Sequence, residues 1–319
     1  MTLISKDINK ASELLKQEEL VSIPTETVYG LAGNIFSEKA IHRIFEMKKR
    51  PLYNPLIVHI HAMEQLEELS SHIPEKAKLL ADAFWPGELT LVLPKDVKIP
   101  DLITANKPTV ALRMPRHQLV QDLLKQIDFP IAAPSANPFG CISPTNAKRV
   151  KDYFDGDLKM VLDGGDCTSG IESTIVGFNG EKAILYRLGS ISKKQIEAVI
   201  GPIAELTKSE KTPNAPGMLL KHYSPRTKTI LTEDVSSILD KNPNKRIGII
   251  CLTSDLESSN SIEIEELSKS SDLNEAAKNL YEVMHRLDHL NLDLIIAKKL
   301  PNEGIGKAIN DRLERASAD

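Results

Sequence analysis

The strongest constraint on this chain is the alternation of short apolar runs with segments of helical period. Buried strands are indicated by runs such as "PLIVHI", "LTLVL" and "TVALRM", and amphipathic helices by "SEKAIHRIFEMKKR" and "EKAKLLADAF". Several of the predicted strands follow one another with no helix between them. We therefore predict a mixed sheet in a layered α/β fold rather than a regular βαβ repeat.

The length of the chain and a linker-like segment within it predict two domains. The chain has 319 residues, which is long for a single hydrophobic core. Residues 206–226, "LTKSEKTPNAPGMLLKHYSPR", are polar, rich in Pro and Lys, and without periodicity, as is typical of a linker. We assign residues 1–205 to a larger domain, 206–226 to the linker, and 227–319 to a small parallel α/β domain.

Composition argues against several classes of protein. A formal net charge of −4 and 4% aromatic residues give no support for a nucleic-acid-binding tail or a stacking platform. Cys141, Cys167 and Cys251 lack CxxC spacing, so we expect neither a disulfide framework nor a zinc knuckle. The first 20 residues lack the apolar core of a signal peptide, and no run approaches the roughly 20 apolar residues that span a bilayer. We predict a cytoplasmic protein with no membrane partner.

Standard nucleotide and metal signatures are missing from the sequence. It contains neither GxxxxGK[ST] nor a complete GxGxxG, and we interpret "GIGKA" at 304–308 as a structural turn before a helix. His285 and His289 stand four residues apart without the Glu of an HExxH motif. We interpret this pair as part of a solvent-exposed helix face.

Polar clusters at the ends of apolar strands carry the functional signal. In "SIPTETVYGLAGN", residues 22–34, polar groups crowd the point where we expect a strand to run into a helix. Four more clusters are "KKRPLYNPLIVHI", "TVALRMP", "APSANPFGCISPT" and "GGDCTSGIESTIV". One such cluster is ordinary turn chemistry. Five together indicate a shared ligand site, because ligands of open α/β sheets bind at strand ends.

Charged and capping residues indicate that the ligand is an anion. Arg50 precedes Pro51 in a stiff loop that could hold it ready for an anion, although a solvated helix end has the same pattern. Arg113 ends a strand where alternation buries a side chain, so it requires a carboxylate or phosphate partner. Ser143 is predicted to cap a helix and to offer free N–H groups to a phosphate. His59, which closes "PLIVHI", is either a satisfied core residue or part of the same site.

Together these motifs resemble the YrdC-like family of L-threonylcarbamoyladenylate synthases. "APGMLLKHYSP" and "GIGKAINDRLERAS" resemble the linker and C-terminal motifs of its longer members, so the resemblance covers nearly the whole chain. It implies an open, twisted mixed α/β sheet with a concave active-site face, plus a smaller Rossmann-like α/β domain.

The resemblance also implies an activity. Such enzymes make threonylcarbamoyl-AMP from L-threonine, bicarbonate or CO2, and ATP, and release pyrophosphate. Mg²⁺ is expected to bind through the ATP phosphates, with no direct protein ligand. A separate tRNA threonylcarbamoyl transferase complex then forms N6-threonylcarbamoyladenosine at position 37 of tRNA. A weak contact of the synthase itself with tRNA is left open.

By motif, the resemblance assigns residues to the two substrates. The L-threonine positions are Thr27, His59, Arg113, Ala133 and Ser173. The ATP positions are Lys48, Lys49, Arg50, Asn54, Thr109, Ser135, Asn137, Ser143, Arg187, and His222 or Tyr223, where the linker would close as a lid. Arg50 and Arg113 would stabilise negative charge, and no nucleophilic side chain is required.

Some alternatives stay open at this point. Thr25 replaces Thr27 as the substrate contact if the strand register slips by two residues, and Glu26 is expected to face solvent rather than to place Mg²⁺. An RNA-binding or ribosome-associated factor on the same fold is a second interpretation. A carbamoyltransferase-type relative is a third, which the scattered cysteines disfavour because its accessory zinc sites could not form.

Overall fold

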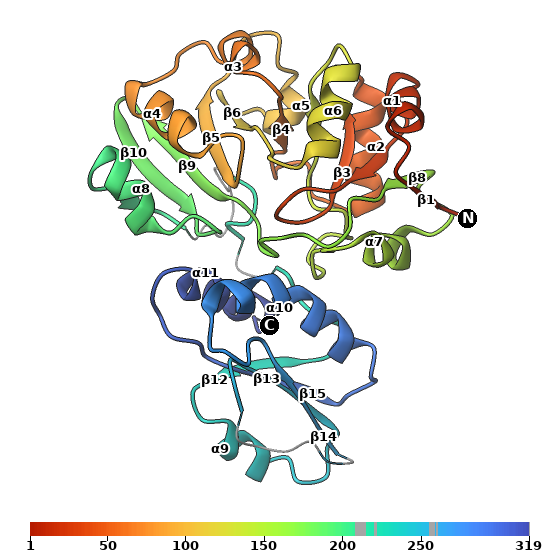
Figure 1. Cartoon of the computed structure of the whole chain (residues 1–319), viewed down its shortest axis with the longest axis vertical. Coiled ribbons are helices and arrows are strands. Elements are labelled where there is room, and N and C mark those ends of the chain that lie inside the picture. The colour runs from red at the N-terminus through yellow and green to blue at the C-terminus, as the bar shows by residue number, and fades with distance from the viewer. Residues whose placement is uncertain (208–214, 220–221, 255–258, 260, 319) are drawn as a thin grey trace.

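The computed structural model describes residues 1–207, 215–219, 222–254, 259 and 261–318. Residues 208–214 and 220–221 of the predicted linker therefore lie outside the described residues. Two bodies, each with its own sheet, are stacked along the long axis of the molecule (Figure 1). No helix of the described ranges is both long enough and apolar enough to cross a membrane.

The larger body is built on one mixed sheet of 11 strands. Parallel and antiparallel neighbours alternate irregularly along it, which confirms the predicted mixed α/β fold. In spatial order the strands are β1 (Leu3–Ser5), β8 (Met160–Leu162), β2 (Val21–Ile23), β3 (Gly30–Asn34), β7 (Ile131–Ala132), β4 (Ile57–His59), β6 (Thr109–Arg113), β5 (Leu89–Pro94), β9 (Thr174–Asn179), β10 (Lys182–Arg187) and β11 (Ala204–Glu205).

Helices cover this sheet, and their ends follow the capping residues. Ser37 accepts a hydrogen bond from the Ala40 amide at the start of α2, and Ser192 forms a capping box with Gln195 at the start of α8. The helices are α1 (Ile8–Lys16), α2 (Glu38–Lys48), α3 (Met63–Leu69), α4 (Glu75–Phe84), α5 (Asp101–Thr104), α6 (Gln118–Gln126), α7 (Ala147–Phe154) and α8 (Lys193–Ile200).

The polar stretch after β2 does not lead into a helix, so that expectation was wrong. β3 returns antiparallel to β2, and residues 24–29 form the connection between them. β3 contains two glycines, which weakened its strand signal. Gly30 packs closely there, since an added Cβ atom would stand 3.1 Å from the Cβ of Ala133 on the neighbouring segment.

The predicted cap at Ser143 was also wrong, because the N-cap of α7 lies three residues later. Asn146 is its N-cap and accepts from the Arg149 amide. Tertiary contacts hold the residues before it: the Ser143 hydroxyl donates to Glu172, and the carbonyl of Pro144 accepts from the Tyr29 amide. These long-range bonds outweigh the local preference for an earlier start.

The smaller body has a four-stranded parallel sheet, as predicted for the C-terminal region. Its strands, in spatial order, are β12 (Thr229–Thr232), β15 (Leu294–Lys298), β13 (Ile247–Cys251) and β14 (Ile262–Glu266). Its helices are α9 (Val235–Asp240), α10 (Leu273–Asp288) and α11 (Gly306–Ala316). α10 and α11 lie between this sheet and the larger body (Figure 1).

α10 is covered on one side by its own sheet and on the other by the larger body (Figure 1). The helix face that we predicted to be exposed to solvent is therefore partly buried. His289 is exposed, but His285 is buried and packs against Tyr153 of the larger body, with ring centroids 5.7 Å apart. The predicted exposed face is therefore wrong for His285. Docking of the two bodies, which periodicity cannot show, buries it.

Candidate active site

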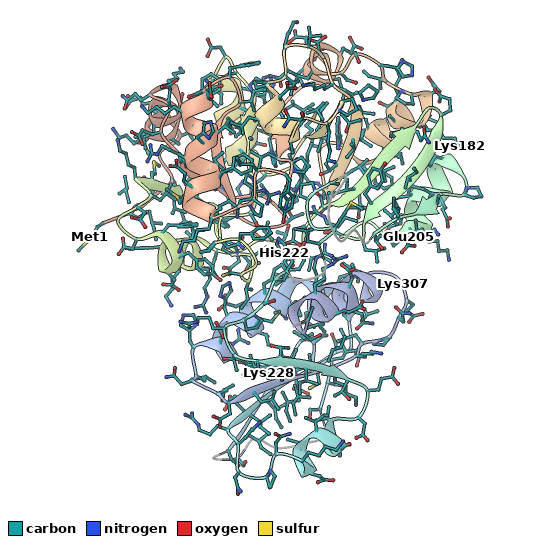
Figure 2. All side chains as sticks on the ribbon, turned by 180° about the vertical axis from the view of Figure 1, so that it is seen from behind. Met1, Lys182, Glu205, His222, Lys228 and Lys307 are labelled. Atoms are coloured by element: carbon teal, nitrogen blue, oxygen red, sulfur yellow. The ribbon has the colours of Figure 1, made fainter. Side chains whose placement is uncertain are left out.

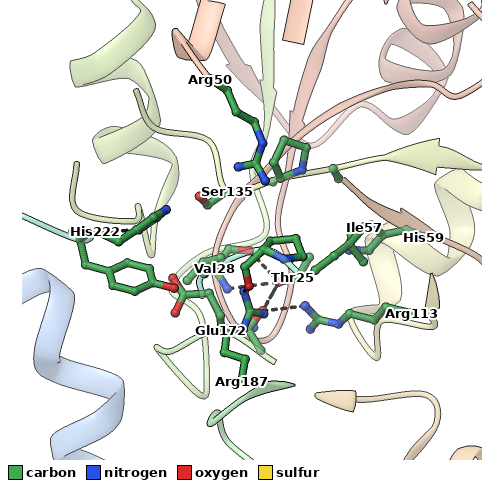
Figure 3. Close-up of a pocket in the computed structure, with 17 residues that line it drawn as sticks. Thr25, Val28, Arg50, Ile57, His59, Arg113, Ser135, Glu172, Arg187 and His222 are labelled. Carbon is green, nitrogen blue, oxygen red and sulfur yellow. Dashed lines mark hydrogen bonds between the residues drawn. The ribbon is translucent and has the colours of Figure 1, made fainter. Parts of the chain in front are cut away.

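A cavity of about 50 Å³ lies where strand ends of the large sheet meet the linker (Figure 3). His222, one of its lining residues, marks the junction of the two bodies (Figure 2). The cavity is lined by Thr25, Thr27, Val28, Gly30, Arg50, Ile57, His59, Arg113, Ala133, Pro134, Ser135, Glu172, Arg187, Pro216, Gly217, His222 and Tyr223.

Thr25 and Thr27, the two threonines of "PTET", make different hydrogen bonds. The Thr25 hydroxyl accepts from the amides of Thr27 and Val28 and donates to the Val28 carbonyl, so it shapes the turn. The Thr27 hydroxyl accepts from Arg113 at 2.9 Å. Both line the cavity, but Thr27 is the one held against the cationic side chain.

Arg113 has the carboxylate partner that its buried position requires. Its Nη2 donates to Glu26 at 2.6 Å, its Nη1 to Thr27, and its Nε to the Gly87 carbonyl at 3.2 Å. Glu26 is 5% exposed and also accepts from the Arg116 amide, so the expectation that it faces solvent was wrong. Burial would raise the pKa of Glu26, but Arg113 outweighs burial and the pKa lies below its usual value.

His59 stands beside Arg113 because β4 and β6 run parallel with these two residues in register. Burial, followed by the charge of Arg113, lowers the pKa of His59 to about 3, so its imidazole is neutral. Its Nδ1 has no hydrogen-bond partner among the residues that the structure describes. An unsatisfied buried polar atom at a cavity wall is a ready contact for a ligand.

Arg50 supplies a second cation, held by its own loop. Its Nε donates to the carbonyl of Asn54 at 3.1 Å and its Nη2 to that of Pro55 at 2.8 Å. Burial lowers the pKa of Arg50 to about 9, which still leaves it charged at neutral pH. The Asn54 side chain is fully buried, and its amide nitrogen and oxygen find no partner in the described ranges. The Asn54 side chain can therefore still donate and accept hydrogen bonds.

Lys48 and Lys49 lie outside the cavity lining. Lys48 is 1% exposed, and its ammonium contacts the carbonyls of Ser135 and Asn137, so it braces the loop after β7. Lys49 ends α2 in the left-handed conformation with its side chain exposed. In this state Lys48 positions Ser135, which does line the cavity.

Arg187 joins β10 to the linker. Its Nε and Nη2 donate to the carbonyl and hydroxyl of Ser173, each at 3.0 Å, and its Nη1 donates to the carbonyl of Pro216. Gly217 follows with φ +83, and a Cβ there would lie 2.9 Å from Arg187 Cδ. The linker passes so close to the arginine that only glycine fits.

The end of the linker closes the cavity with two aromatic rings. His222 and Tyr223 are buried, with ring centroids 4.0 Å apart, and Phe139 lies edge-on to His222. Burial is the main reason that the pKa of His222 falls to about 3. A neutral imidazole and a phenol therefore form this wall.

Two family models match the chain. One described as "Telomere recombination" matches residues 13–189, and one described as "Threonylcarbamoyl-AMP synthase, C-terminal domain" matches residues 191–318. A threonylcarbamoyl-AMP synthase of Pyrococcus abyssi is 40% identical over 97% of this chain and 94% of its own length. One of Bacillus subtilis is 39% identical over 97% and 92%. This chain belongs to the threonylcarbamoyl-AMP synthase family.

Solved structures agree with this membership. The fold matches the crystal structure of Pyrococcus abyssi Sua5 complexed with L-threonine with a TM-score of 0.92 and 38% identity, over 99% of this chain and 98% of that one. The chain has the long form of the threonylcarbamoyl-AMP synthase family, with both domains, and is an enzyme of nucleotidyltransferase type.

The structure gathers part of the set that the family resemblance assigned. The predicted residues that line the cavity are Thr27, Arg50, His59, Arg113, Ala133, Ser135, Arg187, His222 and Tyr223. Those that do not line it are Lys48, Lys49, Asn54, Thr109, Asn137, Ser143 and Ser173. Thr109 begins β6, at the end of the strand opposite to Arg113. Ser173 and Ser143 are fully buried behind the wall.

Sequence reasoning missed Glu172, which lines the cavity. It belongs to the quoted "GIESTIV" motif, so its place beside Ser173 was a signal that we did not use. It also missed Arg312 of α11, which contacts Glu172 at 2.8 Å. Arg312 belongs to the quoted "GIGKAINDRLERAS" motif, but nothing in that motif links it to a site in the other domain.

Proposed function

We propose that this enzyme makes threonylcarbamoyl-AMP from L-threonine, bicarbonate or CO2, and ATP, with release of pyrophosphate. The charge of the cavity carries the proposal. Three arginines, Arg50, Arg113 and Arg187, line it, and the one carboxylate among the described lining residues, Glu172, is already paired. Such a site suits two anionic substrates. The Pyrococcus abyssi relative was crystallised with L-threonine, which supports one of them.

Arg113 is placed to hold the threonine carboxylate. A guanidinium has five N–H donors, and the contacts to Gly87, Thr27 and Glu26 engage three of them. The remaining two can bind a carboxylate, and neutral His59 offers a further polar contact. The threonine amine would attack CO2, forming a C–N bond and losing a proton to give a carbamate.

The second step is transfer of the adenylyl group. A carbamate oxygen attacks the α-phosphorus of ATP, and the bond from that phosphorus to the bridging oxygen of pyrophosphate breaks. The chain contributes position and positive charge rather than a nucleophile, with Arg50 and Arg187 beside the phosphates. Within the described residues, no group of three or more His, Cys, Asp or Glu could hold a metal ion. We expect Mg²⁺ to enter on the triphosphate and to offset its charge.

The linker would act as a lid over both steps. A cavity of about 50 Å³ is far below the roughly 300–1,000 Å³ of ligand pockets. Residues 216, 217, 222 and 223 form one of its walls, so their displacement would admit the substrates. Their return would exclude water, which protects the carbamate and the mixed anhydride from hydrolysis.

The product fits the first step of N6-threonylcarbamoyladenosine formation at position 37 of tRNA. A separate transferase would accept the threonylcarbamoyl group, because a mixed carbamate–phosphate anhydride is an activated donor. The synthase would need no large tRNA surface for this, which agrees with a net charge of −4.

Pyrophosphate release from ATP by the purified chain with Mg²⁺ and bicarbonate tests the proposal. We expect release that depends on both L-threonine and bicarbonate, together with a product that has the mass of threonylcarbamoyl-AMP. Release that ignores threonine, or none with any amino acid, would overturn the proposal. RNA binding by the isolated chain would then become the next measurement.

A further inference from the structure

Glu172 is a meeting point of the two domains at the cavity wall. It is 6% exposed and accepts hydrogen bonds from three side chains. Ser143 of the larger domain donates at 2.7 Å, Tyr281 of α10 at 2.9 Å, and Arg312 Nε of α11 at 2.8 Å. Two of the three partners therefore come from the C-terminal domain.

Arg312 contacts three parts of the molecule at once. Besides Glu172, its Nη2 donates to the Leu188 carbonyl at 2.7 Å and its Nη1 to Asp311 at 2.7 Å. Its guanidinium lies 5.0 Å from the ring centroid of Tyr223, within cation–π range. The side chain has no exposed surface. Arg312 thus contacts the cavity wall, the segment between β10 and α8, and the end of the linker.

The charge of this cluster decides what the cavity can bind. Burial would raise the pKa of Glu172, but Arg312 and then Arg187 hold it at about 2, so Glu172 is a carboxylate. An unpaired carboxylate at this wall would repel the triphosphate that we place beside Arg187. Removing one partner of a buried ion pair leaves an uncompensated charge of this kind.

We propose that Arg312 is a positioning residue through which the C-terminal domain sets the ATP affinity of the active site. It offsets and orients the Glu172 carboxylate and supports Tyr223 at the closed linker. The inference rests on the proposed function for the identity of the ligand, ATP. It gives the C-terminal domain a part in substrate binding beyond holding the fold together.

A second ion pair across the same boundary provides a matched control. Arg149 of α7 donates to Glu282 of α10 at 3.1 and 2.6 Å. This pair is also an arginine with a glutamate, but the Glu282 side chain is 29% exposed and neither residue lines the cavity. Loss of Arg149 weakens domain docking without placing a charge at the site.

The test uses full-length Arg312→Met and Arg149→Met. Binding of the non-hydrolysable analogue α,β-methylene-ATP is measured by calorimetry, KM values for ATP and threonine by pyrophosphate release, and stability by thermal unfolding. We expect Arg312→Met to weaken analogue binding and raise the KM for ATP by about tenfold or more, with the KM for threonine changed less than about threefold. Arg149→Met should leave both KM values within about twofold, whatever its melting temperature.

Rescue identifies the mechanism. Adding Glu172→Gln to Arg312→Met removes the uncompensated carboxylate, so analogue affinity should return to within about threefold of wild type. Arg312→Lys keeps the positive charge, so it should lose less affinity for the analogue than Arg312→Met. The Lys variant can therefore test the proposal if the Met variant does not fold.

Three results would overturn the proposal. The first is equal loss of ATP affinity in Arg149→Met and Arg312→Met, which would make Arg312 a docking residue only. The second is a double variant no better than Arg312→Met, which excludes charge compensation. The third is a wild type that does not bind the analogue. Analogue binding without threonine-dependent pyrophosphate release would instead overturn the proposed function and leave the Arg312 comparison readable.

Discussion

Two buried arginine–glutamate pairs lie beside the cavity, and they present side chains of opposite charge to it. Arg113 and Glu26 both belong to the larger domain and are 2.6 Å apart, whereas Glu172 pairs across the domain boundary with Arg312 at 2.8 Å. In the first pair the arginine lines the cavity, and in the second the carboxylate does.

This difference shows how one kind of pair can serve two purposes. Glu26 orients the Arg113 guanidinium, so that this cation faces the cavity with N–H donors that make no other hydrogen bond within the described residues. Arg312 does the reverse, because it neutralises the carboxylate that the cavity would otherwise present. The first arrangement requires one domain, and the second exists only when two domains are docked.

The largest expected effect breaks the first pair. Arg113→Ala removes the cation and leaves Glu26 buried and unpaired, so we expect kcat/KM for threonine to fall by about a hundredfold or more. The KM for ATP should change much less. Steady-state pyrophosphate release with each substrate varied gives both values. Arg116→Ala, at a side chain that is 62% exposed, is the control, and an equal loss in that variant would contradict the role of Arg113.

A change at the Arg50 loop separates the two substrates. Arg50→Ala should raise the KM for ATP by about thirtyfold and leave the KM for threonine within about threefold, because Arg50 is a cation at the predicted nucleotide end. Calorimetry with α,β-methylene-ATP measures the same loss without turnover. Lys39→Ala on the exposed face of α2 is the control. A threonine-specific defect in Arg50→Ala would show that the two ends are assigned the wrong way round.

A smaller change sharpens the comparison of the two carboxylates. Glu26→Gln keeps the shape of the partner but weakens its hold on Arg113, so kcat/KM for threonine should fall by about tenfold. ATP affinity should stay within about twofold, whereas Arg312→Met affects ATP and spares threonine. If Glu26→Gln reduces ATP affinity instead, the two pairs do not act on separate substrates.

The smallest effect is on stability and concerns one histidine from each end of the cavity. The pKa values of His59 and His222 are about 3, so both stay neutral in the folded state, while the unfolded chain binds their protons near pH 6.5. Stability should therefore fall as pH drops below that value, by about 0.7 kcal/mol per histidine between pH 7 and 6. Urea unfolding at the two pH values, with His59→Asn and His222→Asn, measures this. Each variant should reduce the fall, and an unchanged slope would show that the histidine is not buried neutral.

Much of the fold followed from the sequence because it depends on neighbours along the chain. Periodicity identified α2, α4 and the parallel sheet of the smaller domain. Burial of Arg113 and its need for an acidic partner followed from strand alternation in the same way. Where local signals were weak, as in glycine-containing β3 and glutamate-rich β14, the strands were missed.

The sequence by itself determined the α/β class, the strand ends that supply the site, and the motifs that place the chain in its family. Tertiary structure alone decided which carboxylate each buried arginine meets. Glu26 and Arg113 are separated by 87 positions and Glu172 and Arg312 by 140, so no local pattern joins them. Their pairing depends on desolvation, which arises only when strands, linker and domains have packed together.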